Sequence, residues 1–323
     1  MENYLQATEH LYTAAALEPN VGLCCTTNPV WQFPGLIIPE EMLQMNYGCG
    51  SVINMADLAN EPTILYVGVG GGMELLQFSY FNRRVGGTLG IDVIDEMLEA
   101  SERNMQLAAD QNAWFDPSFI TLKKGDALQL PVADSSIDVA GQNCLFNIFK
   151  EDDLDRALAE MYRVLKPHGR LVMSDPVSQT PIPAHLQADD QLRALCLSGA
   201  LPLERYLERI ARAGFGTIEV RAKRLYRILD TAHYAIDQPI LIDSVEVCAI
   251  KDPMPEDGPC IFTGRSAIYH GDQPYFDDGK GHTLVKHQPL AVCDKTAQAL
   301  QDLQEASIYI SPPTYHYTGG GCC

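Results

Sequence analysis

Cysteine is the residue type in this sequence whose chemistry most needs an explanation. The chain carries 10 cysteines, among them the adjacent pairs Cys24–Cys25 and Cys322–Cys323. It begins MENYLQATEH, a polar stretch without the basic flank and apolar run of a secretory leader, so we expect a cytoplasmic protein. Cysteines in that compartment are more often thiols, metal ligands or redox groups than parts of a disulfide framework. The sequence contains no C-x-x-C spacing, which disfavours a zinc ribbon.

A glycine-rich turn is the second feature that suggests chemistry. Gly68, Gly70 and Gly72 follow the apolar, β-branched run TILYVGV, and glycines let a main chain approach a ligand closely. Asp92 ends the next apolar run, where its carboxylate can accept hydrogen bonds from ribose hydroxyls. Met73 stands where a dinucleotide fold needs its third glycine. The glycines instead read G-x-G-x-G, which favours S-adenosylmethionine over NAD.

Alternating strands and helices must position these residues. Strands are expected at 63–69, 87–93, 119–124, 136–144 and 170–175, and amphipathic helices at 94–110 and 151–169. Such alternation predicts a parallel sheet with helices on both faces and ligands at the carboxyl ends of the strands. Segments 215–229 and 240–251 alternate apolar and polar residues, so we expect them to add an antiparallel edge.

The predicted fold is therefore α/β, a Rossmann-like and mostly parallel sheet with additions at both ends. Residues 1–60 form a helical, cysteine-bearing lead-in and lid, and residues 61–252 form the core. The stretch DPMPEDGP is typical of a linker. Residues 253–323 form a small α+β module that ends in Gly-Gly-Gly-Cys-Cys.

Four segments of the core resemble the class I methyltransferases. They are ILYVGVGGG, GIDVIDEMLEAS, GDALQLPVADSSIDV and ALAEMYRVLKPHGRLVMSD. The resemblance implies an S-adenosylmethionine site that has the glycines at its methionine end and an acidic residue on the ribose. Its expected residues are Gly68, Gly70, Gly72, Asp92, Val93, Asp126, Ala127 and Asn143. The family usually has an acidic residue at the position of Tyr66, so the anchoring of the methionine end differs in this chain.

The cysteine contexts carry a narrower resemblance. YGCG around Cys49, NC at Cys144 and CLSGAL from Cys196, with Cys24–Cys25 upstream, resemble the arsenite S-adenosylmethionine methyltransferases. The C-terminal module and its GGGCC ending resemble the microbial branch associated with arsenosugar synthesis.

This resemblance implies a particular chemistry. Cys49, Cys144 and Cys196 would hold trivalent arsenic, a soft ion that prefers thiolates, with its lone pair directed at the sulfonium methyl. It further implies that methylation raises the oxidation state of arsenic. Cys24 or Cys25 would then take part in its reduction, and thioredoxin or glutathione would restore the enzyme.

Other interpretations stay open on the sequence alone. The core motifs also fit a methyltransferase for a small organic acceptor such as a quinone, and the cysteines fit a thiol-based arsenic-binding protein. Cys322–Cys323 is either an unordered tail or a pair that captures and delivers arsenite. Packing is the expected role of Cys248. Cys260 and Cys293, with His270, His282 and His287, match no familiar zinc spacing.

Charge and hydropathy narrow the choice of partners. The formal net charge of -19 opposes binding to phosphate backbones and anionic membranes. No apolar run approaches the ~20 residues that span a bilayer. We therefore expect a small-molecule or metalloid substrate and no nucleic-acid or membrane partner, while the sequence leaves the oligomeric state open.

Overall fold

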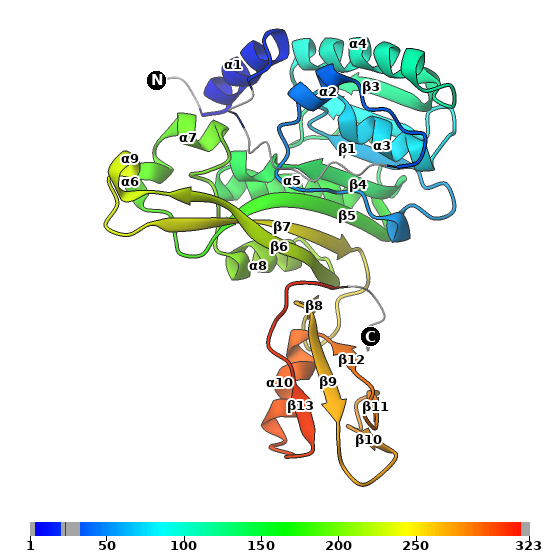
Figure 1. Cartoon of the computed structure of the whole chain (residues 1–323), viewed down its shortest axis with the longest axis vertical. Helices are drawn as coiled ribbons and strands as arrows, with labels where there is room; N and C mark the ends of the chain where they lie inside the picture. The colour runs from blue at the N-terminus through cyan, green and yellow to red at the C-terminus, as the bar shows by residue number, and fades with distance from the viewer. Residues whose placement is uncertain (1–3, 21–22, 24–32, 318–323) are drawn as a thin grey trace.

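The computed structural model describes residues 4–20, 23 and 33–317. Its main part is built around an eight-stranded sheet, and a smaller C-terminal module follows (Figure 1). The strand order is β3-β2-β1-β4-β5-β7-β6-β8. Strands β1 (Ile64–Val67), β2 (Thr88–Asp92), β3 (Ile120–Lys124), β4 (Ile137–Asn143) and β5 (Leu165–Ser178) run parallel. Strand β7 (Ile240–Ile250) is antiparallel to β5 and to β6 (Thr217–Leu229). The expected parallel sheet with an antiparallel edge is confirmed.

Helices cover both faces of this sheet. The side chains of Ile64 and Tyr66 pack into one core and those of Leu65 and Val67 into another, because successive side chains of a strand point to opposite faces. The first core includes residues of α1 (Tyr4–Leu17), α2 (Glu40–Gln44), α3 (Met73–Phe81) and α4 (Asp95–Gln111). The second includes residues of α5 (Glu151–Val164) and α8 (Leu203–Arg212). Short helices α6 (Ala184–Gln187), α7 (Asp190–Ala194) and α9 (Thr231–Tyr234) lie in the connections, as do the 3-10 turns Met55–Asp57, Pro117–Phe119 and Phe146–Ile148.

Helix α5 ends a few residues before Pro167 and Gly169, the residues expected to end it. It stops at Val164, and β5 begins at Leu165 and continues through Pro167 and Gly169. A proline disfavours helical backbone in the residue before it, so the chain turns extended ahead of Pro167. His168 has a φ of +62°, and the pairing register with β4 shifts at this point.

The C-terminal module lies beyond one edge of the main sheet (Figure 1). Its own sheet has the order β12-β9-β13, from β12 (Leu290–Val292), β9 (Arg265–Tyr269) and β13 (Ile308–Ile310). A hairpin of β10 (Tyr275–Asp277) and β11 (Thr283–Val285) and helix α10 (Asp294–Asp302) complete it. Strand β8 (Cys260–Phe262) pairs parallel with β6, so the module starts as the last strand of the main sheet.

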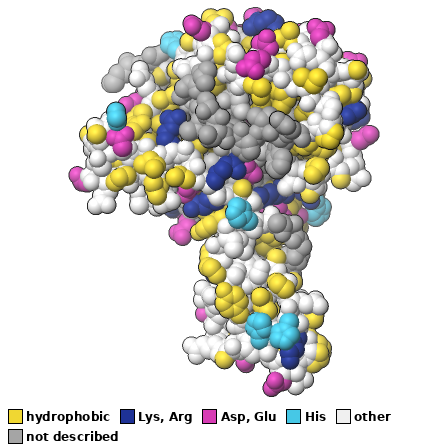
Figure 2. All heavy atoms as spheres, viewed as in Figure 1, with side chains coloured by type: hydrophobic (Ala, Val, Ile, Leu, Met, Phe, Trp, Pro, Cys, Tyr) yellow, Lys and Arg dark blue, Asp and Glu magenta, His cyan; other side chains and the backbone are white. Residues whose placement is uncertain are grey.

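Two observations concern membrane spans and the distribution of charged side chains on the surface. Over the described residues, no helix has the length and apolar character that a membrane span requires. On the face drawn in Figure 2, Lys and Arg side chains are interspersed with acidic ones rather than gathered in one basic stripe.

Candidate functional site

The glycine turn and Asp92 border one cavity at the carboxyl ends of β1 and β2. Gly68 and Gly70 have φ values of +80° and +52°, which a residue with a Cβ adopts only at a cost. The cavity has a volume of about 120 Å³. It is lined by Thr8, Tyr12, Tyr47, Gly68, Gly70, Asp92, Val93, Ile94, Met97, Asn143, Cys144, Leu145 and Ile148. Its mainly apolar walls suit the flat base of a nucleoside, and the buried Asp92 carboxylate offers an acceptor to ribose hydroxyls.

Asp92 is held as a hydrogen-bond acceptor. Its carboxylate accepts from the main-chain N–H groups of Val69 at 2.9 Å and Ile94 at 3.0 Å. Burial raises the pKa of Asp92 to about 6, against the opposing effect of these N–H donors. At neutral pH it is therefore an ionised acceptor in a dry site, as a ribose requires.

Three of the expected cofactor residues lie outside this cavity. Gly72 instead lets α3 approach α4, because a Cβ there would lie 2.4 Å from Cε of Met105. Asp126 is exposed and accepts from the N–H of Leu128, and Ala127 is buried in the second core.

Asn143 connects the cavity to the cysteine-bearing lead-in. Its Oδ1 accepts from the N–H of Cys49 at 2.9 Å, and its Nδ2 donates to the main-chain oxygen of Gly50 at 2.9 Å. The same Nδ2 donates to Glu74 at 3.0 Å. Gly48 permits this approach, since a Cβ there would lie 2.1 Å from Asn143 Nδ2. The sequence predicts Asn143 only as a cofactor residue, although the glycines flanking Cys49 are a signal of close packing.

Cys49, Cys144 and Cys196 lie in one buried core, with exposed fractions of 2%, 3% and 0%. Ser174 joins two of them, because its Oγ lies 3.4 Å from Cys49 Sγ and its main-chain oxygen accepts from Cys144 N–H at 2.7 Å. The Cys196 thiol donates to the main-chain oxygen of Cys144 at 2.7 Å. Segments far apart in the sequence thus meet around Cys144, which also lines the cavity. Sequence reasoning does not find Ser174, which sits in β5 without a motif of its own.

The three thiols lie in this core but are not arranged to coordinate a metal ion. Among the described residues, no group of three or more His, Cys, Asp or Glu side chains is arranged to hold a metal ion. The same result applies to Cys260, Cys293 and the histidines of the module. Cys260 and Cys293 belong to a small apolar cluster with Phe262. Cys248 is fully buried in β7, and burial raises the pKa of its thiol well above the usual range.

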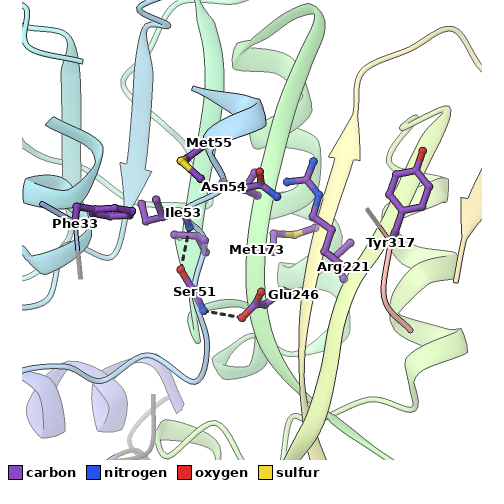
Figure 3. A pocket seen from close by; sticks show the side chains of 12 residues that line it. Phe33, Ser51, Ile53, Asn54, Met55, Met173, Arg221, Glu246 and Tyr317 are labelled. Carbon is purple, nitrogen blue, oxygen red and sulfur yellow. Dashed lines mark hydrogen bonds between the residues drawn. The ribbon is translucent and has the colours of Figure 1, made fainter. Parts of the chain in front are cut away.

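A second cavity, of about 220 Å³, borders the residues that follow Cys49 (Figure 3). The N–H of Ser51 donates to Glu246 at 3.0 Å on one side of it, and Phe33 and Tyr317 line it as well. The predicted redox pair Cys24–Cys25 and the tail pair Cys322–Cys323 lie outside the described residues.

Comparisons with known proteins identify what the chain is similar to. Residues 65–173 match the family model described as a methyltransferase domain. The chain is 28% identical to an arsenite methyltransferase of Aquipseudomonas alcaligenes over 327 residues, covering 95% of this chain and 88% of that protein. It is 25% identical to an arsenite methyltransferase of Rattus norvegicus over 325 residues, covering 96% and 83%. The crystal structure of an arsenic(III) S-adenosylmethionine methyltransferase from Chlamydomonas reinhardtii shares the fold, with a TM-score of 0.59 at 23% identity over 87% of this chain and 95% of that one.

Proposed function

Because the chain belongs to the S-adenosylmethionine-dependent methyltransferases of class I, we propose that it methylates trivalent arsenic held by Cys49, Cys144 and Cys196. The observation that supports this most is that Cys144 lines the same cavity as Gly68, Gly70 and Asp92. A soft ligand thus adjoins the place where a nucleoside methyl donor fits.

S-adenosylmethionine supplies an electrophilic methyl group on a sulfonium. Asp92 would bind the ribose hydroxyls, and Gly68 and Gly70 would let the main chain follow the methionine end. Cys144 and Leu145, at the cavity wall, would lie on the side of the transferable methyl. Holding donor and acceptor in one dry cavity favours an in-line transfer by proximity.

Thiolate chemistry explains why no general base is needed. Trivalent arsenic bound by sulfur keeps its own lone pair, and this pair is the nucleophile. The burial of all three thiols suits a neutral arsenic–thiolate centre, since three bonds to a trivalent ion leave no net charge in the apolar core. The apolar residues around them exclude water from the transfer.

The remaining thiols complete the proposal. A pair of thiols that includes Cys24 or Cys25 would return methylated arsenic to the trivalent state by two electrons and form a disulfide, and thioredoxin or glutathione in the cytoplasm would reduce this disulfide. Cys322–Cys323 would capture arsenite and pass it inward. The product would serve arsenic detoxification or arsenosugar synthesis.

The test is incubation of the protein with labelled S-adenosylmethionine, a thiol reductant and arsenite, followed by chromatographic speciation of arsenic. Label should appear in methylated arsenic and require all three components. Labelling of a quinone-like acceptor without arsenite would instead identify an organic-acceptor enzyme. Arsenite binding without any methyl transfer would identify an arsenic-binding protein.

A further inference from the structure

A third cavity, of about 290 Å³, lies between the beginning of α5 and helix α7. It shares no lining residue with the cofactor cavity. Two cationic residues line it, Lys150 directly before α5 and Arg193 in α7. Glu151 is the one acidic residue of its described lining, and this carboxylate already forms an ion pair with Arg209. In a chain with a formal net charge of -19, such a lining favours an anion.

Arg193 is a buried cation that the described part of the chain leaves without a carboxylate in ion-pair contact. It is 6% exposed, and its guanidinium donates to the main-chain oxygens of Phe149 and Gln187, both at 3.2 Å. Its Nε–H has no acceptor among the described residues, and Asp190 acts on it without direct contact. Burial lowers the pKa of Arg193, but a guanidinium stays protonated at neutral pH. A buried charge without a counter-charge is costly, so this position is suited to an anion.

The Arg193 guanidinium lies at the cavity wall. Both residues whose oxygens accept from it line the cavity, and so does Gly199, where a Cβ would lie 3.1 Å from Arg193 Nη1. Lys150 is exposed, and its Nζ lies 4.6 Å from the ring centre of Tyr4. Over the described ranges Lys150 forms no ion pair, so its charge is available to a ligand as well.

The wall of the cavity narrows the chemistry of the ligand. Phe149, Leu154 and Leu201 line it with apolar side chains. A volume of about 290 Å³ is close to the lower end of small-molecule sites, about 300 Å³, and exceeds what a bare inorganic oxyanion fills. A guanidinium has five N–H donors in a planar fork that matches the two oxygens of a carboxylate, and two of the five donate to main-chain oxygens here.

We propose that this cavity binds a small organic acid, with its carboxylate between Arg193 and Lys150 and its apolar body against Phe149 and Leu154. The main-chain oxygen of Arg193 accepts from Cys196 N–H at 2.8 Å, so the ligand would lie beside the turn that carries Cys196. The inference goes beyond the proposed reaction. It requires neither arsenic nor methyl transfer, so its failure and the failure of the proposed function are separate results.

Calorimetry on the full chain tests the proposal with three probes. Benzoate carries a carboxylate on a small apolar body, benzamide is its neutral counterpart, and inorganic phosphate is an anion without an apolar body. Benzoate should bind with a Kd of about 1 mM or tighter, and benzamide at least about tenfold more weakly. Benzoate affinity should stay the same when S-adenosylhomocysteine saturates the cofactor cavity. Displacement of benzoate by that ligand, equal binding of benzamide, or tighter binding of phosphate than of benzoate would overturn the proposal.

Variants of the two cations locate the binding. Arg193→Met should weaken benzoate binding by about tenfold or more, the loss expected for a charge-assisted hydrogen bond, and Arg193→Lys should lose less. Lys150→Gln, at an exposed position, should weaken it by about twofold to fivefold and provides the test if Arg193→Met does not fold. Lys123→Gln, equally exposed but on β3, is the matched control and should bind like the parent. Parental benzoate affinity in Lys150→Gln and in the folded Arg193 variants would overturn the assignment.

Discussion

The Cys196 thiol lies 2.7 Å from the main-chain oxygen of Cys144, and both residues have left-handed backbone, with φ values of +58° and +65°. A residue with a Cβ adopts this conformation at a cost of about 1 kcal/mol or more, and such strain gathers at functional sites. Glycine would meet the backbone requirement at lower cost. Arsenic binding would require the Cys196 thiol to lose its proton and give up this hydrogen bond.

The first prediction separates the thiol of Cys196 from its backbone. Cys196→Ser keeps a hydroxyl that can donate to Cys144 but removes the soft ligand, so arsenite methylation should be abolished while cofactor affinity stays within about twofold. Cys196→Gly should relieve the strained φ and also abolish methylation, with the free energy of unfolding changed by about 1 kcal/mol or less. Cys248→Ser, at an equally buried position away from the cavity, is the control. Methylation at near-parental rates in the Cys196 variants would contradict the proposal.

The second prediction concerns Asn143. Asn143→Ala removes the hydrogen bonds to Cys49, Gly50 and Glu74, so the lead-in should lose its fixed position against the cavity. The arsenite concentration for half-maximal rate should rise at least tenfold, and the free energy of unfolding should fall by about 1–3 kcal/mol. Steady-state kinetics and urea denaturation measure both. Asn54→Ala, which removes only an exposed turn cap near the same segment, should leave the arsenite dependence unchanged.

The third prediction is a pH dependence of cofactor binding. The pKa of Asp92 is raised to about 6 by burial, so acid below pH 6 neutralises the ribose acceptor. Cofactor affinity should be constant from pH 7 to 8 and fall about tenfold for each pH unit well below 6. Calorimetry with 5′-methylthioadenosine follows this end of the ligand alone. Asp92→Asn should bind more weakly at pH 7 and lose the pH dependence; a parallel slope in that variant would show that another group is responsible.

The fourth prediction concerns stability and Asp175. This carboxylate is fully buried in β5, accepts from Gln142 and Tyr206, and has a pKa raised by burial to about 7. A folded-state pKa above the unfolded value means that the native state binds the extra proton between about pH 4 and 7. Its contribution is therefore full below pH 4 and is lost as pH rises through 7, by up to about 1.4 kcal/mol per unit. Asp175→Asn should lose that part of the pH dependence in urea denaturation; identical pH profiles would contradict the raised pKa.

The fifth prediction concerns the tail. Tyr317 lines the same cavity as Ser51, and the five steps from Tyr317 to Cys322 can span about 17 Å when extended. The double variant Cys322→Ser with Cys323→Ser should raise the arsenite concentration for half-maximal rate and spare the rate at saturation. A chain with Thr318→Ser, which keeps both thiols, is the control. Superimposable rate curves for the double variant and the parent would remove delivery as the role of this pair.

The sequence predicts the parallel sheet because β1, β2 and β4 are apolar runs of strand length separated by helical periodicity. It also predicts the glycine turn and Asp92, since both follow directly from the ends of those runs. The hydrogen bonds of Asn143, Glu74 and Ser174 could not be predicted from the sequence. They join residues that are 69 to 125 positions apart in the chain and share no local pattern. Pro167 and Gly169 are expected to end α5, and the helix stops slightly earlier, at Val164, because a proline also restricts the backbone of the residue before it.

Strand β8 has a consequence for how this chain can be shortened. It is three residues long and pairs with Thr217, Ile218 and Glu219, so it covers the beginning of β6, the strand that would otherwise form this edge of the main sheet. An exposed edge strand offers a template for pairing with another chain, which is a common route to aggregation. A chain truncated within the linker at 252–259 would leave the beginning of β6 as such an edge, whereas one ending after Phe262 would keep the pairing of residues 217–219. The first strand of the module thus protects the beginning of β6 from pairing with another chain, whatever the rest of the module does.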